Sequence, residues 1–135
     1  MKWITWEDKL ITGHAGMDHG HEGLIDLINQ LADAMENNKP KEFCSNLLEQ
    51  FVELTRTHFV AEEQLMDRLR YPKLAEHKAL HAMLIKDVLT FKAVYDAGAS
   101  AEFMTLLVIL DTWMNRDIMG ADKALADFAA ATSVT

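Results

Sequence analysis

Histidines and carboxylates recur in this sequence at spacings that suit the chelation of a metal ion. His58 and Glu62 are four residues apart, and His77 and His81 repeat that spacing. On an α-helix, positions i and i+4 lie on the same side, one turn apart, so each pair can offer two ligands to one ion. Imidazole together with carboxylate favours iron, manganese or zinc over copper(I).

The segments that carry these residues are predicted to be helices. Pro40 and Pro72 lie between periodic stretches, where proline can open a helix without losing a needed hydrogen bond. A third break contains Gly98, the expected C-cap of one helix, and Ser100, the expected N-cap of the next. Apolar residues recur at i, i+3 and i+7, and no stretch alternates as a strand does. The predicted helices span about residues 18–35 (with Asp18 as N-cap), 41–69, 73–95 and 101–130, after an N-terminal arm over residues 1–17.

Short connections between long helices favour antiparallel neighbours, so the sequence predicts an all-α, up-down-up-down four-helix bundle that forms a single domain over residues 1–135. In that topology the start of the first helix, the end of the second, the start of the third and the later part of the fourth lie at one end. Polar residues interrupt the apolar stripes in those four places, where an unpaired polar group is costly to bury. The candidate metal ligands expected at this level are His21, His58, Glu62, His77, His81, Asp117 and Asp122.

The number of these candidates bears on the kind of metal site. Seven ligands are too many for one tetrahedral zinc ion and suit two octahedral ions that share carboxylates. In the adjacent pair formed by Glu62 and Glu63, the first is expected to point inward as a ligand and the second to be a solvated neighbour.

The composition excludes several classes of function. The 135 residues carry a formal net charge of −8 with a pI near 5.1, which argues against nucleic acid and anionic membrane surfaces as partners. Cys44 is the one cysteine, so no intramolecular disulfide can form. The first residues do not resemble a signal peptide, and no stretch approaches the ~20 apolar residues of a spanning helix. These features favour the cytoplasm and leave the oligomeric state open.

The motifs together resemble those of the bacterial hemerythrins, from Trp6 to Asp122. The resemblance is carried by Trp6 ahead of Gly13, by Met17-Asp18 followed by His21 and Leu24, by His58-Phe59 followed by Glu62-Glu63 and Met66, by Tyr71-Pro72 followed by His77 and His81, and by Trp113-Met114 followed by Ile118 and Asp122. It implies a non-haem protein that binds dioxygen or a related small ligand for sensing, storage or delivery.

The resemblance also implies a ligand set. His21 and His58 would bind one iron, His77 and His81 the other, and Glu62 and Asp122 would bridge the two iron ions, which share an oxo or hydroxo group when oxidised. The residues expected around the small-ligand pocket are Phe59, Trp113, Met114 and Ile118.

One position departs from the family pattern. The family places a fifth histidine in W-L-x-x-H-I, and here Asp117 stands at that position. Asp117 could ligate iron, hydrogen-bond a metal-bound water or only fill the gap, and His14 of the arm could substitute as a ligand. Two other classes of function use the same residues: a di-iron enzyme that activates oxygen or peroxide, and a binding protein for zinc, manganese or a single iron.

Overall fold

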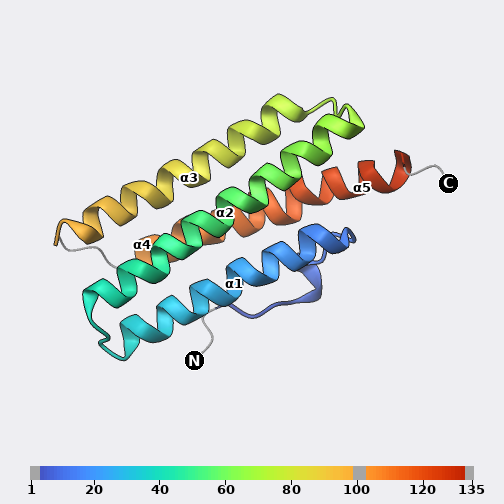
Figure 1. Ribbon diagram of the computed structural model, residues 1–135. Coiled ribbons are helices and arrows are strands. Elements are labelled where there is room, and N and C mark those ends of the chain that lie inside the picture. Colours follow the sequence, from blue (N-terminus) through green and yellow to red (C-terminus); the bar gives the residue numbers. More distant parts are fainter. Residues whose placement is uncertain (1–3, 99–102, 133–135) are drawn as a thin grey trace.

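Four helical columns run antiparallel in the computed structural model, which describes residues 4–98 and 103–132 (Figure 1). In chain order the elements are η1 (Asp8–Leu10), α1 (Ala15–Glu36), α2 (Lys41–Leu69), α3 (Leu74–Asp96), α4 (Phe103–Thr112), η2 (Trp113–Asp122) and α5 (Lys123–Thr132). The last three follow one another without a break and form the fourth column. The prediction of an all-α, up-down-up-down four-helix bundle with an N-terminal arm is confirmed.

The start of the first helix differs from the prediction. α1 begins at Ala15 because His14 is its N-cap: Nδ1 of His14 accepts the backbone N–H of Met17 at 3.2 Å. The expectation that Asp18 caps this helix is wrong. Its carboxylate accepts the backbone N–H of Thr12 at 2.8 Å and the hydroxyl of Thr12 at 2.7 Å. Asp18 therefore fastens the arm to the first turn of α1.

The other breaks follow the turn signals in the sequence. Pro40 precedes α2 as its N-cap. The C-cap of α3 is Ala97 and not the expected Gly98; Gly98 follows it with a φ of +79°, the left-handed conformation that commonly ends a helix. Ser100 and the predicted helix start at residue 101 lie outside the described residues.

The sequence periodicity predicts a regular α-helix for the fourth column, and this prediction is wrong for part of it. Its middle third, Trp113–Asp122, is π-helical, with wider turns and i→i+5 hydrogen bonds. Residues five apart therefore come close to the same side. The buried residues of this segment form two such pairs, Trp113 with Ile118 and Asp117 with Asp122.

Two apolar clusters lie along the bundle axis. The larger one combines Leu24 and Ile28 of α1 with residues of the other columns, such as Leu84 of α3, and the smaller one joins Met66 of α2 to Leu125 of α5. Along each column, the predicted ligands other than Asp117 lie where residues of the larger cluster give way to those of the smaller one. The polar layer is thus enclosed by apolar side chains above and below.

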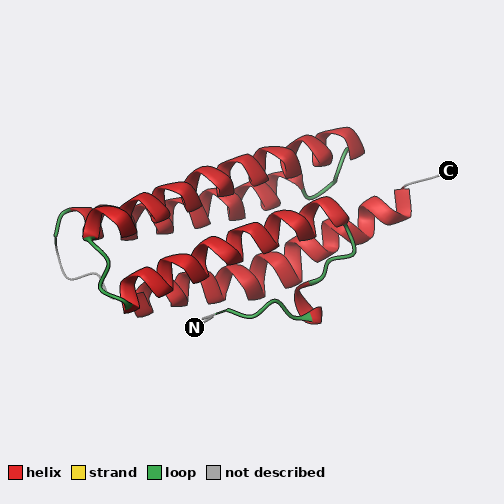
Figure 2. Cartoon of the chain, turned by 60° about the horizontal axis from the view of Figure 1, so that its bottom comes forward, coloured by secondary structure: helices red, strands yellow, loops and turns green. Residues whose placement is uncertain are grey.

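The arm runs along the outside of the bundle towards the end where α1 begins (Figure 2). The buried side-chain amide of Asn29 in α1 accepts the backbone N–H of Ile4 at 2.9 Å and donates to its carbonyl at 2.8 Å. At the other end of the arm, Lys123 Nζ donates to the carbonyl of Thr12 at 3.1 Å. The arm is thus tied to both the first and the fourth columns.

No helix among the described residues is long and apolar enough to cross a membrane.

The amide of Asn29 offers a direct test of how the arm is held. Asn29→Ala removes both hydrogen bonds and leaves the backbone groups of Ile4 unpaired. We expect the free energy of unfolding to fall by about 1–3 kcal/mol, the cost of a buried polar group without its partner. Urea unfolding and amide hydrogen exchange at Ile4 measure this. Gln30→Ala, at the next and exposed position of α1, is the control. Unchanged exchange at Ile4 in Asn29→Ala would show that apolar contacts alone hold the arm.

Candidate metal centre

Six of the seven predicted ligands converge on one level of the bundle. Their ligand atoms form two groups, in each of which all atoms lie within 4.8 Å of one another. The first group is His21, His58, Glu62 and Asp122, and the second is Glu62, His77, His81 and Asp122. The two groups share both carboxylates and differ in their pair of histidines, so they outline two adjoining positions.

Glu62 divides its two oxygens between the groups. Oε2 lies 2.5 Å from Nε2 of His58 and 3.8 Å from Nε2 of His21. Oε1 lies 3.0 Å from Nε2 of both His77 and His81. One oxygen therefore faces each pair of imidazoles.

Asp122 repeats this arrangement from the opposite column. Oδ2 lies 2.9 Å from Nε2 of His21, and Oδ1 lies 2.9 Å from Nε2 of His77. Each carboxylate thus spans the two groups, which is the geometry required of a bridge between two cations.

The secondary structure explains why these side chains meet. The i, i+4 spacing places His58 with Glu62 on α2, and His77 with His81 on α3, in each case on a single side of the helix. The antiparallel columns bring these turns level with His21 near the start of α1. Asp122, at the end of the π-helical segment, enters from the fourth column. The spacing within each helix therefore brings two ligands to the same side, and the antiparallel arrangement of the columns brings these pairs to the same level.

The electrostatics of the metal-free cluster depend on protons shared between imidazoles and carboxylates. Burial by itself would lower the pKa of His21, but the nearby carboxylates of Asp122 and Glu62 outweigh this effect and raise the pKa to about 9. Burial likewise opposes the charge on His77, and the same two carboxylates raise its pKa to about 9. The carboxylate surroundings thus favour the protonated form of both imidazoles.

Glu62 stays ionised despite its surroundings. Burial raises the pKa of a carboxyl group, yet the nearby imidazoles of His21, His58, His77 and His81 hold the pKa of Glu62 well below its usual range. A carboxylate that is 2 % exposed and surrounded by imidazoles is a ready ligand for a cation.

Several buried polar atoms of the cluster have no hydrogen-bond partner among the described residues. They include both ring nitrogens of His21, Nε2 of His58, Oε2 of Glu62 and Oδ1 of Asp122. Buried polar atoms normally have partners, so a group of them aimed at one another fits bound cations. The nitrogen and oxygen donor set suits iron, manganese or zinc.

Asp117 belongs to neither group. It is buried, and its Oδ1 accepts from Nε of Arg116 at 2.7 Å. Burial raises the pKa of its carboxyl group, and the adjacent Arg116 reduces the size of this rise. Its ligation of a metal remains a prediction. His14, the other candidate for the missing ligand, caps α1 and is also in neither group.

Two of the four predicted pocket residues, Phe59 and Trp113, contact histidines of the cluster. Phe59 stacks on His81, with ring centroids 3.7 Å apart and an interplanar angle of 3°. Trp113 meets His21 edge-on at 6.0 Å. Phe59, Trp113 and Ile118 belong to the larger apolar cluster, and the partly buried Met114 packs against it. Their apolar side chains keep bulk water from this side of the polar layer.

Two residues that support the site were missed by the sequence analysis. Gly20 lies against the His58 ring: a Cβ at this position would be 2.7 Å from Cε1 and still closer to Nδ1. The available signal was a glycine inside a helix, directly before His21. Glu63, expected to be solvated, has a side chain only 31 % exposed, and Oε2 lies 2.9 Å from Nδ1 of His81. Helical spacing gave no sign of this contact between helices.

A four-helix bundle that aims imidazoles and carboxylates from all four columns at two adjoining positions has the architecture of a non-haem metal-binding protein. The sequence model of the Hemerythrin HHE cation binding domain matches residues 12–129. The chain belongs to the hemerythrin family, and this membership together with the cluster implies non-haem iron binding.

Individual relatives and solved structures agree with this assignment. The chain is 32 % identical over 129 residues to a bacteriohemerythrin of Stenotrophomonas maltophilia (strain R551-3), covering 94 % of this chain and 82 % of that protein. It is 30 % identical over 117 residues to a myohemerythrin of Theromyzon tessulatum, covering 87 % and 86 %. A crystal structure of a hemerythrin variant shares the fold with a TM-score of 0.85 at 23 % identity, covering 96 % of this chain and 99 % of that one.

The contact between Gly20 and His58 leads to a first prediction for the site. Gly20→Ala improves helix propensity but places a methyl group where the imidazole lies. We expect metal affinity to fall by about tenfold or more with helix content retained. Gly23→Ala is the matched control on the same helix, because its Cβ would meet Leu54 at an ordinary 3.5 Å. Equal metal content in the two variants, measured after dialysis, would contradict the role given to Gly20.

A second prediction concerns protons. With pKa values of about 9, above the ordinary 6.5, His21 and His77 are protonated in the metal-free protein between those pH values. The attraction between these protonated imidazoles and the carboxylates stabilises the metal-free fold. This contribution to the free energy of unfolding is fully present below about pH 6.5 and is lost as the pH rises through about 9. Ligation needs neutral imidazole, so metal affinity should rise with pH across this window. Titration calorimetry with Zn²⁺ in two buffers at about pH 7.5 should show release of about two protons per chain. A release of close to zero protons would show that His21 and His77 are not protonated in the metal-free protein.

Proposed function

We propose that this chain binds two iron ions at the adjoining groups and, through them, dioxygen or a related small ligand for sensing, storage or delivery. The observation that carries the proposal is the sharing of both carboxylates: Glu62 and Asp122 each present one oxygen to each pair of histidines. Such sharing holds two cations side by side. The names of the relatives, bacteriohemerythrin and myohemerythrin, point the same way.

The ligand assignment follows the two groups. His21 and His58 hold one ion, His77 and His81 hold the other, and Glu62 and Asp122 contact both. Each group counts two imidazole nitrogens and two carboxylate oxygens, fewer than the roughly six donors of an octahedral ion. Positions therefore remain for solvent or a small ligand.

The protein surroundings suit a small, weakly polar ligand. When bound, reduced iron supplies the electrons that dioxygen binding requires. The protein positions the imidazoles, offsets part of the charge of the ions with two carboxylates and encloses the site between two apolar clusters. Phe59 and Trp113, against His81 and His21, form an apolar wall that excludes water from the ligand pocket.

Metal analysis and optical spectroscopy together test the proposal. Protein as isolated, or reconstituted anaerobically with Fe²⁺, should hold two irons per chain. Exposure of the reduced protein to dioxygen should produce visible charge-transfer bands that disappear when dioxygen is removed. One iron, or zinc or manganese in its place, would indicate instead a metal reservoir or structural site. Two irons without any spectral response to dioxygen would refute dioxygen binding.

A second candidate function is an enzyme that activates oxygen or peroxide. The observation in its favour is the buried carboxylate of Asp117, which stands where the family pattern has an imidazole. Carboxylate-rich di-iron sites support such chemistry. Turnover with peroxide and a reducing co-substrate, faster than that of free iron, is the result that would favour this function.

Removal of the shared carboxylate tests the bridge. Glu62→Ala deletes the anion that faces both groups, so two cations would face each other with less charge between them. We expect loss of at least one metal per chain while circular dichroism shows the helices retained, because the larger apolar cluster lies beyond the site. Glu53→Ala, at an exposed position of the same helix, should keep the parent metal content. A Glu62→Ala protein that still holds both metals would contradict the bridging role.

Substitutions at Asp117 test the departure from the family. Asp117→His offers a third imidazole and raises the charge of the centre by one unit, which favours reduced iron. We expect Fe²⁺ to bind about tenfold more tightly and to autoxidise more slowly. Asp117→Ala separates the remaining roles, because it weakens iron binding only if Asp117 is a ligand. Arg116→Gln, which keeps the carboxylate and removes its partner, is the control. An Asp117→His protein identical to the parent in affinity and autoxidation would show that this side chain points away from the metals.

A further inference from the structure

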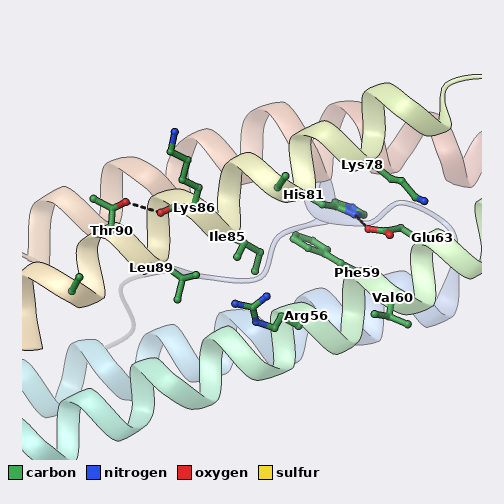
Figure 3. Close-up of a pocket in the computed structure, with 12 residues that line it drawn as sticks. Arg56, Phe59, Val60, Glu63, Lys78, His81, Ile85, Lys86, Leu89 and Thr90 are labelled. Carbon is green, nitrogen blue, oxygen red and sulfur yellow. Dashed lines mark hydrogen bonds and ion pairs between the residues drawn. The ribbon is translucent and has the colours of Figure 1, made fainter.

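His81 is held on three sides by contacts from neighbouring side chains. Phe59 covers one face of its ring, and His77 meets the ring at 4.6 Å with an interplanar angle of 81°. At the ring edge, Nε2 faces Oε1 of Glu62 inside the cluster, and Nδ1 faces Oε2 of Glu63 on the outer side. The contact between His81 and Glu63 crosses from α3 to α2 and is drawn as a dashed line in Figure 3.

The contact to Glu63 distinguishes His81 from the other three histidines of the metal cluster. Among the described residues, the carboxylates near His21, His58 and His77 all approach Nε2, and His81 is the one whose Nδ1 also lies within 4 Å of a carboxylate. A carboxylate accepts but does not donate when ionised, so Nδ1 of His81 carries the hydrogen in this pair. A ring that keeps its hydrogen on Nδ1 can give up the one on Nε2 when a metal binds, and the lone pair of Nε2 then points into the cluster.

We propose that Glu63 is a positioning residue of the metal centre: it fixes His81 in the tautomer that ligates through Nε2 and makes this imidazole a stronger donor. The inference rests on the proposed binding of metal at the two groups. A carboxylate that accepts from the outer nitrogen of a metal-ligating histidine fixes the ring orientation and raises its basicity. The metal held by His77 and His81 is therefore bound more tightly than those ligands alone would allow, and its oxidised state is stabilised.

Glu63 also connects the centre to the protein surface. It lines an open groove between α2 and α3, together with Phe59, His81 and Ile85, and Arg56 and Lys78 are at the sides of this groove (Figure 3). Its side chain is 31 % exposed, whereas Glu62 is 2 % exposed. The influence of Glu63 on the metal thus passes through one hydrogen bond between a partly solvated carboxylate and a buried ring.

The variants that test this role are Glu63→Gln, which keeps the shape and removes the charge, and Glu63→Asp, which keeps the charge on a shorter side chain. Glu53→Gln, exposed on the same helix, removes the same charge away from the site. We expect Glu63→Gln to bind Fe²⁺ about tenfold to a hundredfold more weakly in anaerobic chelator competition, and to have a higher reduction potential. Glu63→Asp should recover part of both properties, and Glu53→Gln should match the parent. In a His81→Ala background, the effect of Glu63→Gln on affinity should vanish.

Nitrogen NMR of the metal-free protein provides a readout independent of metal loading. The parent should show a hydrogen on Nδ1 of His81, whatever the state of Nε2, and Glu63→Gln should lower the occupancy of that hydrogen. If the parent binds two irons and Glu63→Gln equals Glu53→Gln in affinity, potential and tautomer, the role of Glu63 is refuted while the proposed function stands. If the effect of Glu63→Gln persists without His81, it does not act through that ring, and the inference also fails. A parent chain that binds no metal would overturn both.

Discussion

Two carboxylates, those of Glu62 and Asp122, lie almost fully removed from water in the middle of an apolar bundle. Burying an ionised carboxylate costs several kcal/mol unless opposite charges and hydrogen bonds compensate it. Here the compensation comes from four imidazoles on three of the four helices. Two of these imidazoles, those of His21 and His77, favour the protonated form when no metal is present. The bundle can close around this layer only if cations, whether protons or metal ions, neutralise it.

Several features of the fold serve this polar layer. The absence of a side chain at Gly20 leaves room for the His58 ring, so two helices can approach each other at the level of the site. The π-helical turns before Asp122 direct a carboxylate inward from a column that also buries Trp113. Apolar clusters on both sides keep the layer dry, which strengthens every charge interaction within it. These features lower helical regularity but hold the donors in place.

Charged residues around the polar layer continue this charge compensation towards the surface. Glu63 faces the outer nitrogen of His81, and Arg116 pairs with the buried Asp117. Both contacts join a buried group to one that is partly exposed, so charge compensation continues to the surface of the bundle. The contact of Glu63 also makes the surroundings of the two histidine pairs unequal, because among the described residues it reaches only His81 of the cluster. Under the proposed binding of metal, the two positions would differ in donor strength.

The sequence by itself determined the helices, their order and the six residues that meet at the site, because the period of an α-helix and the antiparallel order of short-linked columns fix which positions share one level. It also showed, at Asp117, the departure from the family pattern. Tertiary structure alone decided what depends on contacts between helices: the place of Glu63 beside His81 and the close approach of Gly20 to His58. It also replaced Asp18 by His14 as the cap of α1, since the carboxylate of Asp18 is engaged by the arm. No periodicity within one segment encodes such contacts, because they depend on how closely and at what rotation two helices pack.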